Sequence, residues 1–296
     1  MHRQSRVAMR LLPVLVAGLC ACTGGSKPSS SADAGAAGVT VAASAPAAKL
    51  ATTLAATASA TPSEKPAVAQ GGGPNAASAK APACPADMAL VDGDYCPEPI
   101  LNCLEWTDPP GEYHEYRCAK YAKPTCRSAK RSAMRFCIDK LEYTKSGEKL
   151  PLAHQSWTSA KGVCEAQGKR LCMEAEWQFA CEGPDMHPYP YGDGLTRDAT
   201  ACNIDKTNLG RANDLIDYRE VSGSHPRCVS PFGVYDMSGN IEEWATQETP
   251  PDPKDRSTMK GAWWLPGRNT CRARTVGHTE IYEGSQVGVR CCEAAK

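Results

Sequence analysis

The chain has 296 residues, with 33 Lys or Arg against 33 Asp or Glu, so it is formally neutral. From residue 84 onward, 26 basic residues stand against 31 acidic ones, and this net charge of about minus five argues against nucleic acid as a partner. Sixteen cysteines, fourteen of them in the same part, indicate a disulfide-rich domain that folds in an oxidising compartment.

The first 21 residues have the organisation of a signal peptide. Three arginines precede an apolar run, residues 11–19, that is shorter than the roughly 20 residues a membrane-spanning helix needs. Leu19-Cys20-Ala21-Cys22 resembles a bacterial lipobox, and Cys20 is the poorer lipid acceptor because Leu19 stands where a small residue is wanted. We predict that lipidated Cys22 anchors the protein in a bacterial cell envelope, facing periplasm or cell exterior, with plain signal-peptidase cleavage as the alternative.

Residues 22–83 consist mostly of Ala, Ser, Thr, Pro and Gly, and the first aromatic residue of the chain is Tyr95. Such a composition cannot bury enough apolar surface to offset the entropy of ordering the chain. We interpret it as a disordered tether with a root-mean-square span of about 40 Å. The composition leaves a binding role for this segment open.

The segment 84–133 carries five cysteines among prolines and charges without a clear period, and we expect an irregular, cross-linked lead-in. Alternation of apolar and polar residues predicts a strand over 135–143. Ser156 is a candidate N-cap for a helix over 157–167, and a second helix is expected over 174–181. Both are followed by a glycine, Gly168 and Gly183.

Beyond Gly183, glycines and prolines interrupt the chain every few residues, and regular patterns become rare. Long irregular connections need a stabiliser other than secondary structure, and disulfides or bound cations are the usual ones. The composition and the spacing of these breaks therefore agree on a disulfide-stabilised domain.

Four ordered blocks resemble the formylglycine-generating enzyme (sulfatase-modifying factor) family. They are GKRL with EAEW (168–177), YG with CNI (191–204), FGVYDMSGNIEEW (232–244) and GVRC (288–291). The resemblance covers about residues 136–292, and four blocks in order are far more specific than one. It implies a family domain over 134–296 with an irregular α+β fold, little regular secondary structure and a relation to C-type lectin-like domains.

The resemblance also implies two disulfides, Cys164 with Cys291 and Cys181 with Cys271. Five further cysteines are additional to the family pattern, and pairing Cys202 with Cys228 is a guess. Cys172 stands where the family signature has proline, and Met173 where it has threonine, which indicates a subfamily with an extra cross-link.

A calcium site is implied at the turn 236–243, because calcium prefers several hard oxygen ligands together. By resemblance, its ligands are the side chains of Asp236 and Glu243 and the carbonyls of Gly239 and Ile241. The alternative is an Asp-capped turn with a solvated Glu243. A second site would use Asn203 and Ile204 with an acid or amide near Asn213 or Asp214, where the spacing matches the family only loosely.

The catalytic pair of the family is missing from this sequence. Relatives that make formylglycine bind copper with two cysteines five residues apart, and the aligned positions here hold Leu265 and Thr270. Leucine cannot ligate copper, and a threonine hydroxyl is a poor ligand for the cuprous ion, so a copper cofactor is not expected. Cys271, one position along, would serve only if the loop were shifted, and it is better explained as the partner of Cys181.

Two hypotheses remain for the function. The first is a non-catalytic binding or scaffold domain with a ligand groove lined by Trp263, Trp264 and Arg268, residue types that binding hot spots favour. Adjacent tryptophans are as often part of a core. The second is an oxidoreductase that acts through other groups on a residue of an exported protein. An exported protein or a glycan is the expected ligand, and the sequence does not distinguish them.

Overall fold

The computed structural model describes residues 82–112, 114–207, 210, 215–252 and 254–296. The chain divides into two units, Met1–Gly71 and Gly72–Lys296, and all described residues belong to the second. The predicted signal peptide, nearly all of the tether and Cys22 lie outside the described residues. None of the helices in the described part is long and apolar enough to cross a membrane.

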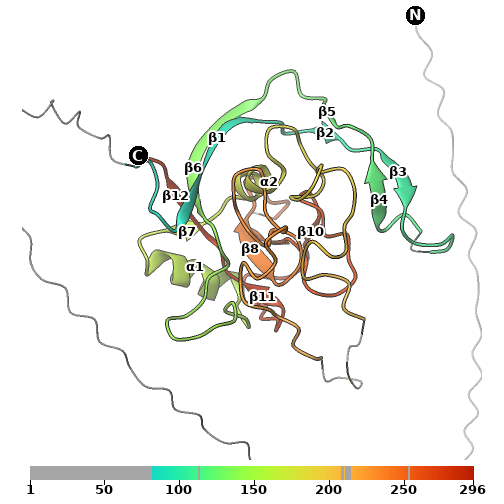
Figure 1. The fold of residues 1–296 in the computed structure, drawn as a ribbon. Helices are drawn as coiled ribbons and strands as arrows, with labels where there is room; N and C mark the ends of the chain where they lie inside the picture. The colour runs from blue at the N-terminus through green and yellow to red at the C-terminus, as the bar shows by residue number, and fades with distance from the viewer. Residues whose placement is uncertain (1–81, 113, 208–209, 211–214, 253) are drawn as a thin grey trace, which may run out of the picture. The chain divides into compact units, whose positions relative to one another are not determined.

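The first sheet joins segments from both ends of the domain (Figure 1). Its strand order is β1 (Met88–Tyr95), β6 (Ser132–Asp139), β12 (Cys291–Ala294) and β7 (Arg170–Leu171), with every neighbouring pair antiparallel. The Lys296 N–H donates to the carbonyl of Ala83 at 2.9 Å, so the two ends of the described part lie side by side.

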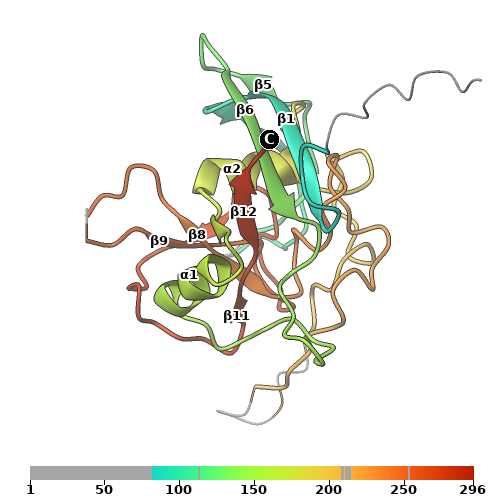
Figure 2. The same cartoon turned by 90° about the vertical axis from the view of Figure 1, so that its left-hand side faces the viewer.

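The second sheet carries the functional residues described below. Its order is β10 (Arg274–Thr275), β9 (Ser257–Lys260), β8 (Glu242–Thr246) and β11 (Val287–Gly288). The β11 strand runs parallel to β8, and the other pairs are antiparallel. Figure 2 shows this sheet with the two helices α1 (Trp157–Glu165) and α2 (Glu174–Glu182).

Both helices were predicted from local signals, and both are confirmed. The Ser156 side chain accepts from the Ser159 N–H at 3.1 Å, and Ser159 bonds back, which completes a capping box at α1. At α2, Met173 replaces the family's threonine, and the Glu176 carboxylate accepts from the Met173 N–H at 2.8 Å instead. The predicted strand is confirmed as β6, although it begins and ends earlier than expected.

The expectation of an irregular lead-in over 84–133 is wrong in one respect. This segment contributes β1, which pairs with β6 along its whole length, so the expected boundary at residue 134 falls inside a strand. Alternate residues of β1 (Ala89, Val91, Tyr95) are buried because one face of the strand packs against the core, where Phe179 of α2 contacts Tyr95. In the sequence, the alternating apolar pattern that predicts a strand is interrupted by glycine and aspartate within β1.

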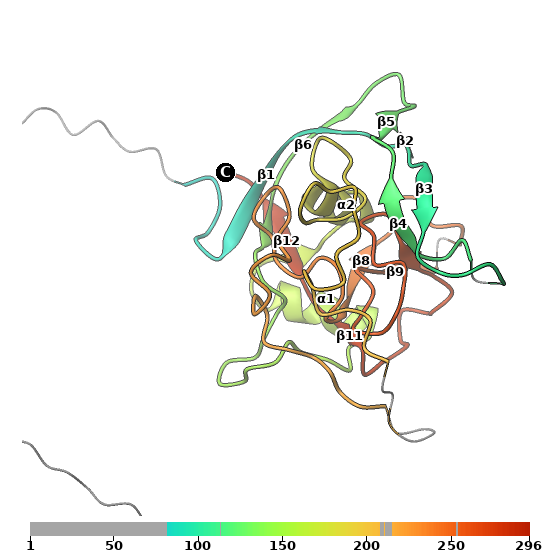
Figure 3. The same ribbon diagram turned by 45° about the vertical axis from the view of Figure 1, so that its right-hand side comes forward.

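The rest of the lead-in forms an arm, residues 96–126, that extends away from the first sheet (Figure 3). It consists of two antiparallel two-stranded sheets, β2 (Pro99–Ile100) with β5 (Thr125–Cys126) and β3 (Cys103–Trp106) with β4 (Cys118–Tyr121). The arm contacts the loop 189–197, where the Tyr121 N–H donates to Leu195 O at 2.9 Å.

All fourteen cysteines of the described part form disulfides. The two pairs implied by the resemblance, Cys164–Cys291 and Cys181–Cys271, are both present, and so is the guessed Cys202–Cys228. The others are Cys84–Cys137, Cys96–Cys126, Cys103–Cys118 and Cys172–Cys292. Seven disulfides indicate an extracytoplasmic protein. Among the described residues, no helix or strand lies between Glu182 and Glu242, which confirms the expected irregular fold.

Candidate functional site

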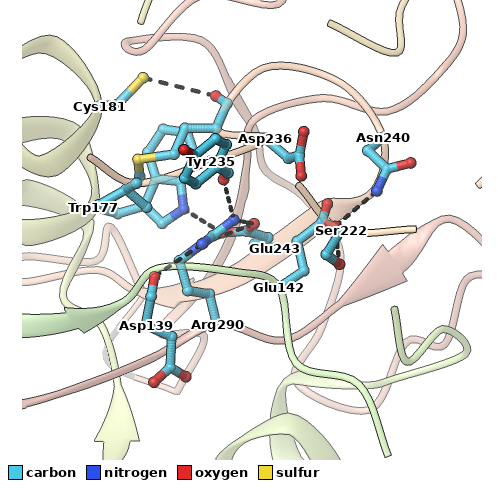
Figure 4. Close-up of polar contacts among 12 residues, drawn as sticks. Asp139, Glu142, Trp177, Cys181, Ser222, Tyr235, Asp236, Asn240, Glu243 and Arg290 are labelled. Atoms are coloured by element: carbon cyan, nitrogen blue, oxygen red, sulfur yellow. Dashed lines mark hydrogen bonds and ion pairs between the residues drawn. The ribbon is translucent and has the colours of Figure 1, made fainter. Parts of the chain in front are cut away.

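A buried ion pair occupies the centre of the domain (Figure 4). Arg290, between β11 and β12, binds the Glu243 carboxylate of β8 through Nε at 2.8 and 2.9 Å and through Nη2 at 2.6 Å. Both side chains are at most 1% exposed. The indole N–H of Trp177 donates to Glu243 at 2.6 Å, and Arg290 also donates to the carbonyls of Asp139 and Tyr235.

Among the described residues, Glu243 is the carboxylate bonded to this guanidinium, and the carboxyl groups of Glu142 and Asp236 lie near it. Figure 4 shows Glu142 beside Asp236 and Glu243, which come from the two ends of the turn 236–243. Burial, reinforced by the charges of Asp236 and Glu243, raises the pKa of Glu142 well above its ordinary value. Burial also raises the pKa of Asp236. The cluster therefore has an excess of negative charge unless a proton or a cation joins it.

Glu142 is a residue that the sequence reasoning missed. Its side chain is 3% exposed, and its Oε2 atom accepts from Ser222 Oγ and from Asn240 Nδ2, both at 2.7 Å. Oε1 has no hydrogen-bond partner among the described residues. No local pattern marks it, because β6 ends at Asp139 and all of residues 136–139 are buried, whatever their parity.

The turn 236–243, called the calcium turn here after the site predicted for it, has a tight left-handed backbone. Asp236 and Gly239 have φ angles of 58° and 85°, and a Cβ at Gly239 would lie 2.3 Å from the carbonyl oxygen of Asn203. Only glycine allows this close approach. The Asp236 carboxylate accepts from the Gly223 N–H at 2.6 Å. The turn thus brings Asp236, Gly239 and Asn203 together.

The oxygens at this turn suit a hard cation only in part. The Glu243 oxygens already accept from Arg290 and Trp177, whereas Glu142 Oε1 and Asn203 Oδ1 have no partner in the part of the chain that the structure describes. In that same part, no group of three or more His, Cys, Asp or Glu side chains is arranged to hold a metal. Asp236 and Glu142 are therefore the carboxylates left for a cation, together with neutral oxygens.

The structure describes only part of the second predicted cation site. Asn203 is buried, and its Nδ2 donates to Tyr218 O at 2.7 Å and to Asn240 Oδ1 at 2.9 Å. Ile204 follows it in a buried cluster. Asn213 and Asp214 lie outside the described residues. Asn203 and Asn240 link this region directly to the calcium turn.

The loop 261–269, called the groove loop here, holds the residues predicted to line a ligand groove, and it is hydrogen-bonded to the calcium turn. The Gly239 N–H donates to Gly261 O at 2.9 Å, and the Ser238 hydroxyl donates to Asn269 O at 2.9 Å. Trp263 is half-buried and Arg268 is exposed. The prediction for Trp264 is wrong, because it is 1% exposed and packs as a core side chain against Trp263.

The positions aligned with the family's thiols lie on the same loop. Leu265 is half-buried, and the Thr270 hydroxyl accepts from the Ala273 N–H at 3.2 Å. Cys271 is fully buried and bonded to Cys181. No cysteine of the described part has a free thiol, since all fourteen are in disulfides.

Glu242 is a second residue that the sequence reasoning missed. It lines a pocket beside the groove loop, together with Trp263 and Arg268. Successive side chains of a strand point to opposite faces, so Glu243 faces the ionic centre and Glu242 faces the pocket. Two adjacent glutamates at the start of a strand were the available signal.

The sequence of the chain matches a known protein family. Residues 110–295 match the family described as "Sulfatase-modifying factor enzyme 1-like domain". The "Inactive C-alpha-formylglycine-generating enzyme 2" of Mus musculus is 31% identical over 160 residues, covering 49% of this chain and 50% of the relative. The "Formylglycine-generating enzyme" of Streptomyces coelicolor is 31% identical over 167 residues, covering 49% and 53%. The chain spans about half the length of the curated relatives it matches.

Solved structures give a weaker likeness. CarF has a TM-score of 0.49 at 16% identity, with 72% of this chain and 99% of that chain covered. PvdO from Pseudomonas aeruginosa has a TM-score of 0.47 at 16% identity, with 73% and 100% covered.

Proposed function

The chain belongs to the sulfatase-modifying factor enzyme 1-like domain family, and from this premise we propose that it is an envelope-tethered binding domain without formylglycine-generating activity. The observation that supports the proposal most is Cys271, which is buried in a disulfide while Leu265 and Thr270 occupy the family's thiol positions. A cuprous ion prefers thiolates, and neither of those two side chains supplies one. Relatives of this chain include one named inactive and others named as the enzyme.

Activity is tested directly on the purified protein. We expect no aldehyde by mass spectrometry when the protein, loaded with cuprous ion, is offered a sulfatase-type cysteine peptide under oxygen. The formylglycine-generating enzyme of Streptomyces coelicolor, assayed in parallel, controls for the peptide and the oxidant. Aldehyde formation that disappears in Cys271→Ser would instead support the oxidoreductase alternative.

The groove loop is the binding surface that we propose. Trp263 and Arg268 are of the residue types that carry most binding energy at interfaces. The loop is fixed by the buried Asn269, whose Oδ1 accepts from Arg197 at 3.4 Å and whose Nδ2 donates to Trp263 O at 3.4 Å. A preorganised loop loses little entropy on binding. The ligand would be an exported protein or a glycan.

Calcium is a second proposal, and it rests on the excess of negative charge at the turn 236–243. Asp236 and the unpartnered Oε1 atom of Glu142 would hold the ion with neutral oxygens of the turn, while Glu243 stays with Arg290. Bound calcium would neutralise buried carboxylates and join segments that are distant in sequence.

Removal of the ion tests this proposal. A ligand that binds the folded state stabilises it, so a chelator should lower the thermal unfolding midpoint by several degrees, and added calcium should restore it. Glu142→Gln should weaken calcium binding at least about tenfold by calorimetry, whereas the exposed Glu98→Gln should leave it unchanged. An unchanged midpoint after chelation would contradict the proposal.

A further inference from the structure

The pocket beside the groove loop joins Trp263 and Arg268 to polar side chains that the proposals above do not use. Its volume is about 90 Å³, and its walls include Tyr116 of the arm, Glu242 of β8, Arg274 of β10, and Trp263 and Arg268 of the loop. This is room for several water molecules, so the pocket accepts a small polar group of a larger ligand rather than a whole ligand.

Glu242 is the acceptor in this pocket. It is 5% exposed, and its Oε1 atom accepts from the Thr275 hydroxyl at 2.8 Å. Among the described residues, the Glu242 carboxylate has no second hydrogen-bond donor. It also has no basic group from that part of the chain within 4.0 Å. A buried carboxylate with one hydrogen bond is costly, and a further donor that enters through the pocket would relieve that cost.

Two arginines supply donors to the same space. Arg268 lies over the Tyr116 ring, 5.6 Å from its centroid, and has no carboxylate partner in the described part of the chain. Arg274 contacts Glu174 through Nη1 at 3.2 Å, which leaves other donors of its five free for a ligand. Glu242 thus shares the pocket with two guanidinium groups without forming an ion pair with either.

This charge pattern discriminates between ligand classes. An ammonium group would meet two guanidinium groups, and a carboxylate would meet Glu242. A hydroxyl group both donates and accepts, so one hydroxyl can donate to Glu242 and accept from an arginine. The pocket therefore suits neutral, hydroxyl-rich ligands better than charged ones.

Trp263 adds an apolar platform at the edge of the pocket. Its ring packs against the buried Trp264 at a centroid distance of 5.1 Å and an interplanar angle of 58°. Because Trp264 is held in the core, it fixes the orientation of the half-exposed Trp263 ring. A flat, preoriented indole beside paired donors and acceptors suits a ring that has an apolar face and hydroxyls at its edge.

We propose that this pocket receives hydroxyl groups of a saccharide, which bridge Glu242 and the two arginines while the sugar ring packs on Trp263 at the edge of the pocket. The proposal rests on the binding function proposed above and names its ligand class. Peptide binding at the same groove is the competing outcome.

Calorimetry and tryptophan fluorescence on the full chain test the proposal with a stated panel. The probes are methyl glycosides of glucose, galactose and mannose, N-acetylglucosamine, and blocked tripeptides centred on Lys, Glu or Gln. We expect at least one sugar to bind at millimolar concentration or below. Glu242→Ala and Arg268→Gln should each weaken that binding at least about tenfold, whereas the exposed Glu105→Ala and Arg127→Gln should not change it.

Three results would overturn the proposal. The first is binding of peptides but of no sugar, which would leave the binding function intact and assign it another ligand. The second is sugar binding that survives both Glu242→Ala and Trp263→Ala. The third is no binding of any probe by a protein that forms aldehyde, in which case the proposed function fails as well.

Discussion

At the scale of single residues, one arginine orders the centre of the domain. Arg290 joins β8 through Glu243, β6 through the Asp139 carbonyl, and the residue before the turn 236–243 through the Tyr235 carbonyl. The sequence predicted that Asp236 and Glu243 belong to one centre, but it assigned Glu243 to a cation. The pairing with Arg290 spans 47 positions, and no local pattern reports a contact of that length.

Replacing Arg290 should therefore destabilise the domain strongly. Arg290→Met removes the partner of a carboxylate that is 1% exposed, and an uncompensated buried charge costs about 3 to 5 kcal/mol. Denaturant unfolding measures this loss. The control is Arg135→Met, which breaks a half-exposed pair with Asp92 and should cost less than about 1 kcal/mol. Equal losses in the two variants would argue against a special role for Arg290.

At the scale of elements, local signals predicted the helices better than the strands. The Ser156 capping box and the apolar face of α1 are contained in a dozen residues, so α1 could be placed from the sequence. By contrast, Val91 of β1 pairs with Phe136 of β6, and β12 joins the same sheet from the end of the chain. Strand pairing at such distances depends on tertiary packing, which a single sequence does not display.

Some disulfides lie in the core of the domain and others in the arm. Removing one of each kind should therefore have different effects. Cys164–Cys291 closes 127 residues, and the chain-entropy model gives it about 5 kcal/mol, against about 3 kcal/mol for the 15 residues closed by Cys103–Cys118. We expect the paired alanine variant of the first to raise hydrogen exchange throughout the domain. The variant of the second should raise it within the arm alone. Global exchange after loss of Cys103–Cys118 would show that the arm supports the core.

At the scale of the whole molecule, the predicted anchor and the proposed groove would have complementary roles. The seven disulfides indicate a domain outside the cytoplasm, and a tether of about 60 residues would let its groove sample the space above a membrane. High local concentration at the surface compensates for a weak monovalent ligand. Under these conditions, a pocket that binds its ligand with only millimolar affinity would still be occupied.

The anchor itself gives the last prediction. Residues 19–22 resemble a lipobox, and Cys22 lies before the tether rather than among the cysteines that form disulfides. A single acyl chain binds membranes reversibly, whereas a diacylated and further acylated cysteine holds a protein stably. Cys22→Ser should therefore move the protein from the membrane fraction to the soluble fraction, while Cys20→Ser should leave it in place. If both variants fractionate like the unaltered chain, the lipidation prediction is wrong. The signal segment would then be cleaved without lipidation, and the domain would act without a membrane anchor.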